Sequence, residues 1–158
     1  MWNALVAEFS DLADAHEATR LAVRLVVAAL MGAVIGYDRE RNASPAGLRT
    51  HMLVALGAAL FVLVGQHAGF DRADMSRVVQ GLVAGIGFLG AGAILKRDET
   101  FSVRGLTTAA SIWLTAAIGI AAGFGQLVTA FVAAVMGVIV LGALARADRS
   151  VRKEPDKG

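Results

Sequence analysis

Residues 21–41 read LAVRLVVAALMGAVIGYDRER, an apolar stretch with one internal charge, Arg24, that ends in four charged residues. The hydrocarbon of a bilayer is about 30 Å thick, and a helix that crosses it needs about 20 mostly apolar residues. Charged side chains directly after such a stretch are typical of the membrane surface. The segment therefore predicts a transmembrane helix over residues 21–37, with residues 38–41 at the surface.

The rest of the chain contains four more apolar stretches of this kind. They cover residues 52–69, 78–95, 107–122 and 127–145. With 56% hydrophobic and only 18% charged residues among 158, the composition is too apolar for a soluble domain of this length. We predict an all-α fold, a polytopic membrane bundle of about five transmembrane helices.

Three regions differ in composition along the chain. In residues 1–19, apolar residues recur at helical spacing with acidic residues between them, which predicts an amphipathic lead-in helix at the membrane interface. Residues 20–145 hold the membrane domain, and residues 146–158 form a charged tail. The chain has no cysteine, which excludes disulfides, zinc–thiolate sites, iron–sulfur clusters and cysteine nucleophiles.

The basic residues predict the orientation. Eleven of the 15 Lys and Arg residues follow the first or third helix or lie in the tail. By the positive-inside rule this side is cytoplasmic, so the N-terminus is expected outside and the C-terminus inside. These residues are spread over loop ends and do not form a stripe with aromatic residues, so no nucleic-acid partner is expected.

A shift of the sequence by 58 residues predicts an internal repeat. It places residues 31–60 over residues 89–118 with nine identical positions out of thirty, including Gly-Leu-x-Thr at 47–50 and again at 105–108. Both copies would enter the membrane from the cytoplasm. The sequence thus predicts a parallel repeat of two helix pairs, related by an axis near the membrane normal, plus a fifth helix.

Glycine spacing indicates close helix packing. Gly32 and Gly36, like Gly81 and Gly85, lie one turn apart, where a neighbouring backbone can approach, and such faces also suit a homo-oligomer. A GxGxxG pattern begins at Gly85, but it lies inside an apolar stretch and does not follow a strand, so a dinucleotide site is rejected.

The candidate site residues lie near the predicted cytoplasmic surface. Asp38 and Glu40 end the first helix and Arg49 begins the second, so this charged group is either a topology anchor or a site for a hydrated cation such as Mg²⁺. Asp38 is the one candidate metal ligand, and no cofactor is expected. We expect an ion pair between Asp38 and Arg49, with Arg104 contributed by the other repeat loop.

The fourth helix adds hydroxyl groups to this set. Thr108 and Ser111 share a helix face with Thr115, which indicates hydrogen bonding between helices or the lining of a polar route, and Thr107 lies beside them. His51 is interpreted as a polar residue between helices. The sequence contains no recognisable nucleophile–base arrangement, so we predict that the protein is not an enzyme.

Four ordered motifs resemble a known family. They are Gly-Tyr-Asp-Arg-Glu-Arg at 36–41, Ala-Gly-Leu-Arg-Thr-His-Met-Leu-Val at 46–54, Gly-Ile-Gly-Phe-Leu-Gly-Ala-Gly at 85–92 and Val-Arg-Gly-Leu-Thr-Thr-Ala-Ala at 103–110. In this order they resemble the transmembrane domain of the MgtC/SapB family of bacterial inner-membrane proteins. Longer members continue from this domain into a soluble domain, whereas here we expect a charged tail over residues 146–158.

The resemblance implies a multi-pass protein of the bacterial inner membrane that is linked to adaptation to magnesium limitation or envelope stress, and to virulence. Two functions stay open. The chain either moves a small ion or solute, with Mg²⁺ as ligand or substrate, or it regulates another membrane complex such as the F-type ATP synthase. A carrier needs a polar cavity that reaches the middle of the membrane, whereas a regulator needs only an exposed helix face.

Overall fold

The computed structural model describes residues 15–97 and 102–151, with side chains described for residues 15–94 and 105–143. This part of the chain forms five long helices and one short hairpin. In chain order the elements are α2 (Ala15–Arg41), α3 (Leu48–His67), α4 (Arg72–Ala93), β1 (Leu95–Arg97), β2 (Ser102–Arg104), α5 (Leu106–Gly123) and α6 (Leu127–Val151). The predicted all-α bundle of five helices is confirmed.

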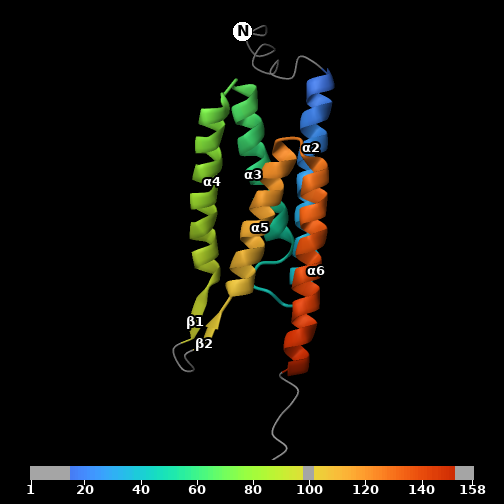
Figure 1. Cartoon of the computed structure of the whole chain (residues 1–158), viewed down its shortest axis with the longest axis vertical. Coiled ribbons are helices and arrows are strands. Elements are labelled where there is room, and N and C mark those ends of the chain that lie inside the picture. Colours follow the sequence, from blue (N-terminus) through green and yellow to red (C-terminus); the bar gives the residue numbers. More distant parts are fainter. Residues whose placement is uncertain (1–14, 98–101, 152–158) are drawn as a thin grey trace, which may run out of the picture.

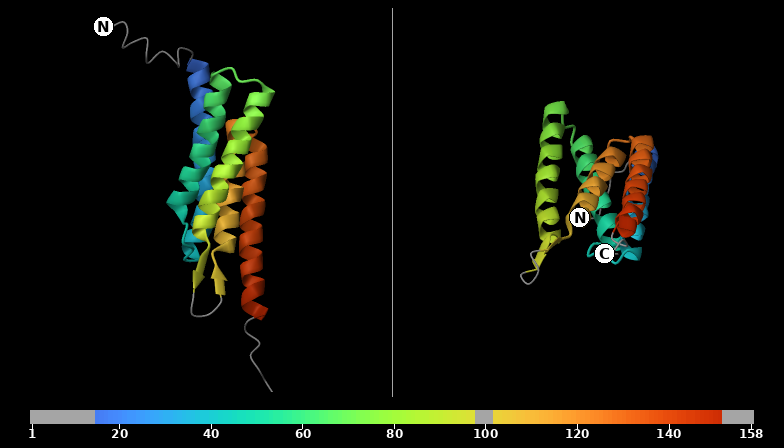
Figure 2. Two further views of the ribbon diagram at one scale, coloured as in Figure 1. Left: turned by 90° about the vertical axis from the view of Figure 1, so that its left-hand side faces the viewer. Right: turned by 60° about the horizontal axis from the view of Figure 1, so that its bottom comes forward.

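The helices run alternately up and down, with α3 and α5 in the centre (Figures 1 and 2). The helix α5 contacts α2, α3, α4 and α6, while α4 packs against α5 and, less extensively, against α3. The α2–α3 connection, the hairpin and the C-terminal end of α6 lie together at one end of the bundle (Figure 1). We call this the hairpin end, and the other the opposite end.

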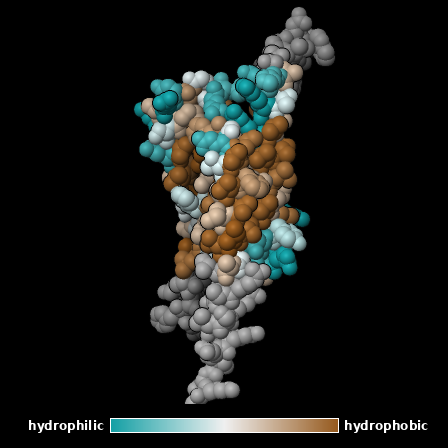
Figure 3. All heavy atoms as spheres, turned by 45° about the vertical axis from the view of Figure 1, so that its right-hand side comes forward, coloured by the Kyte–Doolittle hydropathy of each residue, from teal (hydrophilic) through white to brown (hydrophobic). Residues whose placement is uncertain are grey.

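Four of the helices are long and apolar enough to cross a membrane: α2, α3, α4 and α5. In α6 the residues whose side chains are described form a further apolar segment, Leu127–Ala143. On the face shown in Figure 3, hydrophobic side chains form a band across the molecule, with hydrophilic groups above and below it. This distribution is the one expected for a protein surrounded by lipid.

The hairpin differs from the sequence-based prediction. The third apolar stretch was expected to remain helical to residue 95, but α4 ends at Ala93, and Ile94 adopts an extended conformation. Strands β1 and β2 then pair antiparallel, with Leu95 opposite Arg104. Pairing satisfies the backbone groups of a connection that starts close to hydrocarbon, where unpaired groups are costly. The apolar character of Ile94 and Leu95 therefore did not mark a helix.

The first and last described helices, α2 and α6, are longer than the apolar stretches that predicted them. The predicted lead-in helix lies mostly in residues 1–14, which are outside the described residues, while residues 15–19 are the start of α2. The backbone of α6 remains helical to Val151, so the first six residues of the segment 146–158 continue this helix.

Small residues let the central helices pack closely. A Cβ atom added to Gly32 would lie 2.6 Å from the carbonyl oxygen of His51, and one added to Gly119 would lie 2.3 Å from that of Ala55. Real Cβ atoms do not approach this closely, so the crossings of α2 and α5 with α3 require glycine. The core beside them consists of small and branched apolar side chains from α2, α3, α5 and α6: Ala28, Ile35, Ala55, Ala59, Ile118, Ala122, Ala130 and Ala134.

Two contacts recur at the spacing of the predicted repeat. Gly32 of α2 packs against His51 of α3, and Gly90 of α4, 58 residues later, packs against Ala109 of α5, which is 58 residues after His51. Gly47 and Gly105 are likewise the N-cap residues of α3 and α5. These contacts agree with a repeat of two helix pairs, whereas the predicted rotation between the pairs stays a prediction.

Candidate functional site

The α2–α3 connection positions the first part of the candidate site. A side-chain oxygen of Glu40 accepts a hydrogen bond of 2.7 Å from the backbone N–H of Leu48, the first residue of α3. A carboxylate at this position accepts from one of the free N–H groups of the helix. Its negative charge is also stabilised by the positive end of the helix dipole. Gly47 leaves the room for it, because an added Cβ would overlap the Glu40 carboxylate. Glu40 therefore fixes the start of α3.

His51, one turn further along α3, connects this region to α5. Its side chain is fully buried. Its Nε2 lies 3.0 Å from Oγ of Ser111, and its Nδ1 lies 2.8 Å from the carbonyl oxygen of Gly47. The interpretation of His51 as a polar residue between helices is confirmed by this contact.

The proton positions around His51 follow from the partners. The Gly47 carbonyl can only accept, so Nδ1 of His51 donates. Ser111 lies within reach of two acceptors, Nε2 of neutral His51 and, at 2.8 Å, the carbonyl oxygen of Thr108. When His51 is neutral, the hydroxyl can donate to Nε2. When His51 is charged, Nε2 donates to Ser111, which donates to Thr108. One hydroxyl thus satisfies both protonation states.

Two more hydroxyl groups extend the cluster. Oγ1 of Thr108 lies 3.0 Å from Oγ of Ser44 in the α2–α3 connection, and Thr115 donates to the carbonyl oxygen of Ser111. Thr108, Ser111 and Thr115 are all buried. No described buried side-chain nitrogen or oxygen lacks a hydrogen-bond partner. We call Ser44, His51, Thr108, Ser111 and Thr115 the polar cluster; it connects α3, α5 and the loop before α3.

Asp38 has different partners from those expected. Its carboxylate forms an ion pair with Arg39, the next residue, whose side chain is only 8% exposed. Asn42 donates to Asp38 as well, at 3.3 Å. Arg49 is exposed and forms no ion pair with Asp38 in the described structure. The prediction of an Asp38–Arg49 pair was wrong, because Arg39 reaches the same carboxylate from within α2.

The other candidate residues do not join this group. Thr107 is exposed, on a different face of α5 from Thr108. Arg104 lies on β2, where the backbone alone is described. Of the candidate residues, Thr108 and Ser111 are therefore buried and Asp38 is half-buried. Glu40 belongs to α2 and caps α3, while Arg49 and Thr107 are exposed.

A resident Mg²⁺ site is not supported by the described residues. No three Asp, Glu or His side chains among them come together as a metal site. Asp38 is already neutralised by Arg39, and a cation at Asp38 would have to displace that guanidinium. Glu40 is occupied by the N–H of Leu48. Mg²⁺ prefers free carboxylates with room for several waters, and neither carboxylate offers this in the conformation observed.

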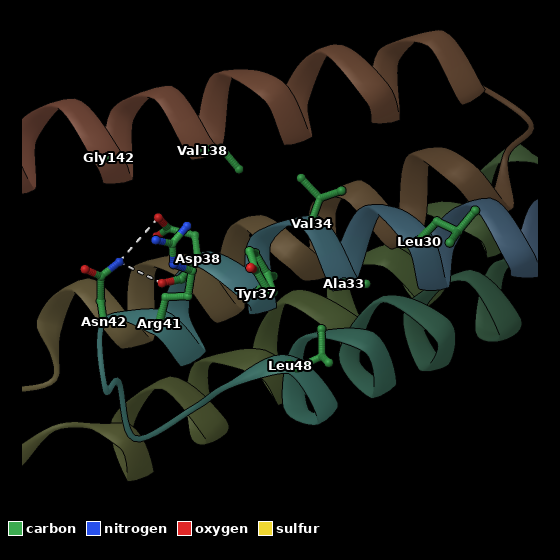
Figure 4. Close-up of a pocket in the computed structure, with 10 residues that line it drawn as sticks. All are labelled: Leu30, Ala33, Val34, Tyr37, Asp38, Arg41, Asn42, Leu48, Val138 and Gly142. Atoms are coloured by element: carbon green, nitrogen blue, oxygen red, sulfur yellow. Dashed lines mark hydrogen bonds between the residues drawn. The ribbon is translucent and has the colours of Figure 1, made fainter.

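A groove of about 990 Å³ opens between α2 and α6, next to Asp38. Figure 4 shows Asp38, Arg41 and Asn42 together at one end of it, with Leu30 and Val34 towards the other. The guanidinium of Arg41 lies over the ring of Tyr37, 5.8 Å from its centroid. We call this the α2–α6 groove; it is apolar over most of its length and polar at the hairpin end.

Arg24 connects three helices at the opposite end. It donates to the side-chain oxygen of Gln66 at 2.9 Å and to the carbonyl oxygen of Gly123, at the end of α5, at 3.0 Å. A cation is favourable at a helix C-terminus, whose last carbonyls are otherwise free. The sequence identified Arg24 only as the one charge inside the first apolar stretch. Neither partner could have been identified from sequence spacing, because they lie 42 and 99 residues away.

Comparison with known proteins identifies relatives over most of the chain. The sequence model of the MgtC family matches residues 25–150. Protein SrpB of Synechococcus elongatus is 52% identical over 116 residues, which cover 66% of this chain and 64% of the relative. The putative magnesium transporter YhiD of Escherichia coli K12 is 41% identical over 126 residues, 75% of this chain and 58% of the relative. Protein MgtC of Salmonella typhimurium is 44% identical over 114 residues, 72% of this chain and 48% of the relative.

The chain thus spans about half to two thirds of the length of these relatives. No solved structure matches the chain.

Proposed function

Because the chain belongs to the MgtC family, we propose that it is a bacterial inner-membrane protein of magnesium homeostasis that acts by binding another membrane protein. In this proposal it does not carry Mg²⁺ through its own helices. The hairpin end faces the cytoplasm, as the distribution of Lys and Arg predicts. The magnesium connection is taken from the relatives, one of which is named a putative magnesium transporter.

The observation that supports binding over transport is the apolar centre of the bundle. Between the polar cluster and Arg24, the core contains Ala28, Ala55, Ala59 and Ile118, all fully or almost fully buried. Gly119 and Gly123 of α5 contact the backbone of α3 there. Mg²⁺ gives up its water reluctantly and is bound through oxygen ligands. A core of alanine, isoleucine and glycine offers it no such path.

The polar cluster fits a structural role in this proposal. Its hydroxyls and imidazole bind to each other or to backbone carbonyls, so they fix the crossing of α3 and α5. The faces of α4 and α6 that do not contact other helices, with Phe88 and Phe131 exposed, are available to a partner. In a bilayer such a partner is held by close packing and not by a gain in hydrophobic burial.

Transport is the second candidate, and one observation favours it. The polar cluster extends from Thr108 to Thr115, two turns of α5, so a polar environment reaches into the bundle from the hairpin end. A second conformation that opens the core beyond Thr115 would complete a path. Asp38 would then lie near its cytoplasmic mouth.

Flux and growth measured on the same protein separate the two candidates. We expect purified protein in liposomes to give no Mg²⁺ uptake above that of empty liposomes, while the gene restores growth of a deletion strain at low magnesium. Mg²⁺ uptake that depends on the protein would contradict the proposal. Asp38→Asn is expected to reduce growth by disturbing Arg39, and Asp74→Asn, an ion-paired aspartate at the opposite end, serves as the matched control.

A further inference from the structure

We propose that the α2–α6 groove binds one phospholipid with an anionic headgroup, its acyl chains along the apolar wall and its phosphate beside Arg41. This inference concerns a ligand of the protein and does not depend on whether the chain carries Mg²⁺ or binds a protein partner. It rests on the lining of the groove, its length and the charge at its polar end.

The whole groove, with its polar end included, is about as long as one leaflet of the hydrocarbon layer is thick. Leu30, Ala33 and Val34 of α2 form one side of it, and Val138 and Gly142 of α6 form the other. From Leu30 to Arg41 the helix rises about 16 Å, at about 1.5 Å per residue. Half of the roughly 30 Å hydrocarbon layer is about 15 Å. The groove therefore extends from the middle of the membrane to its surface at the hairpin end.

The apolar part of the groove suits acyl chains, because aliphatic side chains, alanine and glycine line it and offer no hydrogen-bonding partner. A Cβ added at Gly142 would meet no atom within 4 Å, so the small residues Ala33 and Gly142 leave the groove open. Thin, flexible chains can occupy such a space without moving α2 or α6.

The polar end presents one guanidinium group to the groove. Asp38 is paired with Arg39, and the carboxylate of Glu40 accepts from the N–H of Leu48 and does not line the groove. Arg41 is therefore the one charged residue of the described lining that has no ion pair. The guanidinium of Arg41 lies at this end of the groove with Asp38 and Asn42, 5.8 Å from the centroid of the Tyr37 ring (Figure 4). Guanidinium groups bind phosphate oxygens well, often with two parallel hydrogen bonds. The site thus combines an apolar channel with a phosphate-binding group at membrane-surface depth.

Native mass spectrometry of the full chain in detergent tests the assignment. The purified protein is titrated with phosphatidylglycerol, with phosphatidylcholine and with inorganic phosphate. We expect one phosphatidylglycerol molecule to bind more tightly than phosphatidylcholine, and inorganic phosphate not to bind. Arg41→Gln should weaken phosphatidylglycerol about fivefold, the effect of one basic residue at a charged membrane surface. Arg41→Lys should retain most of the binding.

A groove-filling variant tests the apolar wall separately. Val34→Trp should prevent binding of both lipids, whereas Val26→Trp, at another exposed valine of α2 that lies outside the groove, should not. Arg49→Gln controls for general surface charge, because Arg49 is exposed at the same end but does not line the groove. Equal binding by wild type, Arg41→Gln and Val34→Trp would overturn the proposal. So would binding of inorganic phosphate alone, or a co-purified protein that Val34→Trp releases while lipid binding is unchanged.

Discussion

At the residue scale, the contact between His51 and Ser111 connects the two central helices. Ser111→Ala would leave Nε2 of His51 without its partner, and no other side chain is described within hydrogen-bond distance of that atom. We expect a loss of about 1 kcal/mol in the free energy of unfolding, the usual size for hydrogen bonds between membrane helices. Unfolding in mixed detergent and dodecyl sulfate micelles would measure it.

The matched control is Ser76→Ala, at an exposed serine of α4. This variant removes the same hydroxyl group at a position where no described hydrogen bond is lost, so we expect no measurable change in the free energy of unfolding. If both variants unfold at the same denaturant fraction as wild type, the polar cluster does not stabilise the bundle.

The sequence identified only part of this cluster. Thr108, Ser111 and Thr115 could be placed on one helix face because a helix repeats every 3.6 residues. Their partners could not, because Ser44 and His51 come from another part of the chain. The pairing of Asp38 failed for a related reason. Arg39 and Arg49 are both near in sequence, and only the direction of each side chain decides which one reaches the carboxylate.

At the scale of elements, the α3–α5 crossing depends on Gly119. A Cβ atom there would lie 2.3 Å from the backbone oxygen of Ala55, so Gly119→Ala forces the two helices apart. We expect a loss of about 1–3 kcal/mol in stability, the typical cost of overpacking, together with lower abundance in the membrane. Thermal unfolding in detergent and quantitative immunoblotting would measure the two effects.

Gly57→Ala in α3 makes the same chemical change at an open position, because no atom lies within 4 Å of an added Cβ. Alanine is the better helix former, so this variant should be neutral or more stable by about 0.5–1 kcal/mol. A loss at both positions would mean that packing is not what distinguishes them.

The glycine pattern predicted packing without identifying where it occurs. Gly32 and Gly36 of α2 lie against the backbone of α3, as such spacing suggests. At Gly81 and Gly85 of α4 no atom lies within 4 Å of an added Cβ. The same spacing of glycines thus occurs at a helix–helix contact in α2 and on a face of α4 that contacts no other described helix. Whether a second chain covers the α4 face stays a prediction.

At the scale of the whole molecule, orientation in the membrane can be tested with two single cysteines, because the chain has none of its own. Ala73 lies in the first turn of α4 at the opposite end, and Ser102 lies on β2 at the hairpin end. We expect a membrane-impermeant thiol reagent added to intact cells to label Ala73→Cys from outside, while Ser102→Cys reacts only after permeabilisation. Labelling of both from the same side would contradict the predicted topology.

The architecture followed from the sequence more completely than the site did. Apolar stretches bounded by charges are long, continuous signals, and each corresponds to one helix. The hairpin was missed because three-residue strands give almost no periodic signal. Which helices lie in the centre also could not be predicted, since the hydropathy of these helices does not follow their burial: α2 is more apolar than α5 but less buried. The helices in the centre are recognised by glycines that contact the backbone of a neighbouring helix, and these contacts are visible only in the structure.

The attachment of α6 has a mechanical consequence. Between Leu127 and Ala143 this helix has one polar side chain, Thr129, and it contacts α2 and α5 through Ala130, Ala134 and Gly137. The central helices, by contrast, are joined by hydrogen bonds at both ends. Under a pulling force applied to the C-terminus, the contacts of α6 would separate by sliding, without the rupture of a side-chain hydrogen bond from residues 127–143. The last helix would therefore leave the bilayer at the lowest force, while α2, α3 and α5 yield together at a higher one.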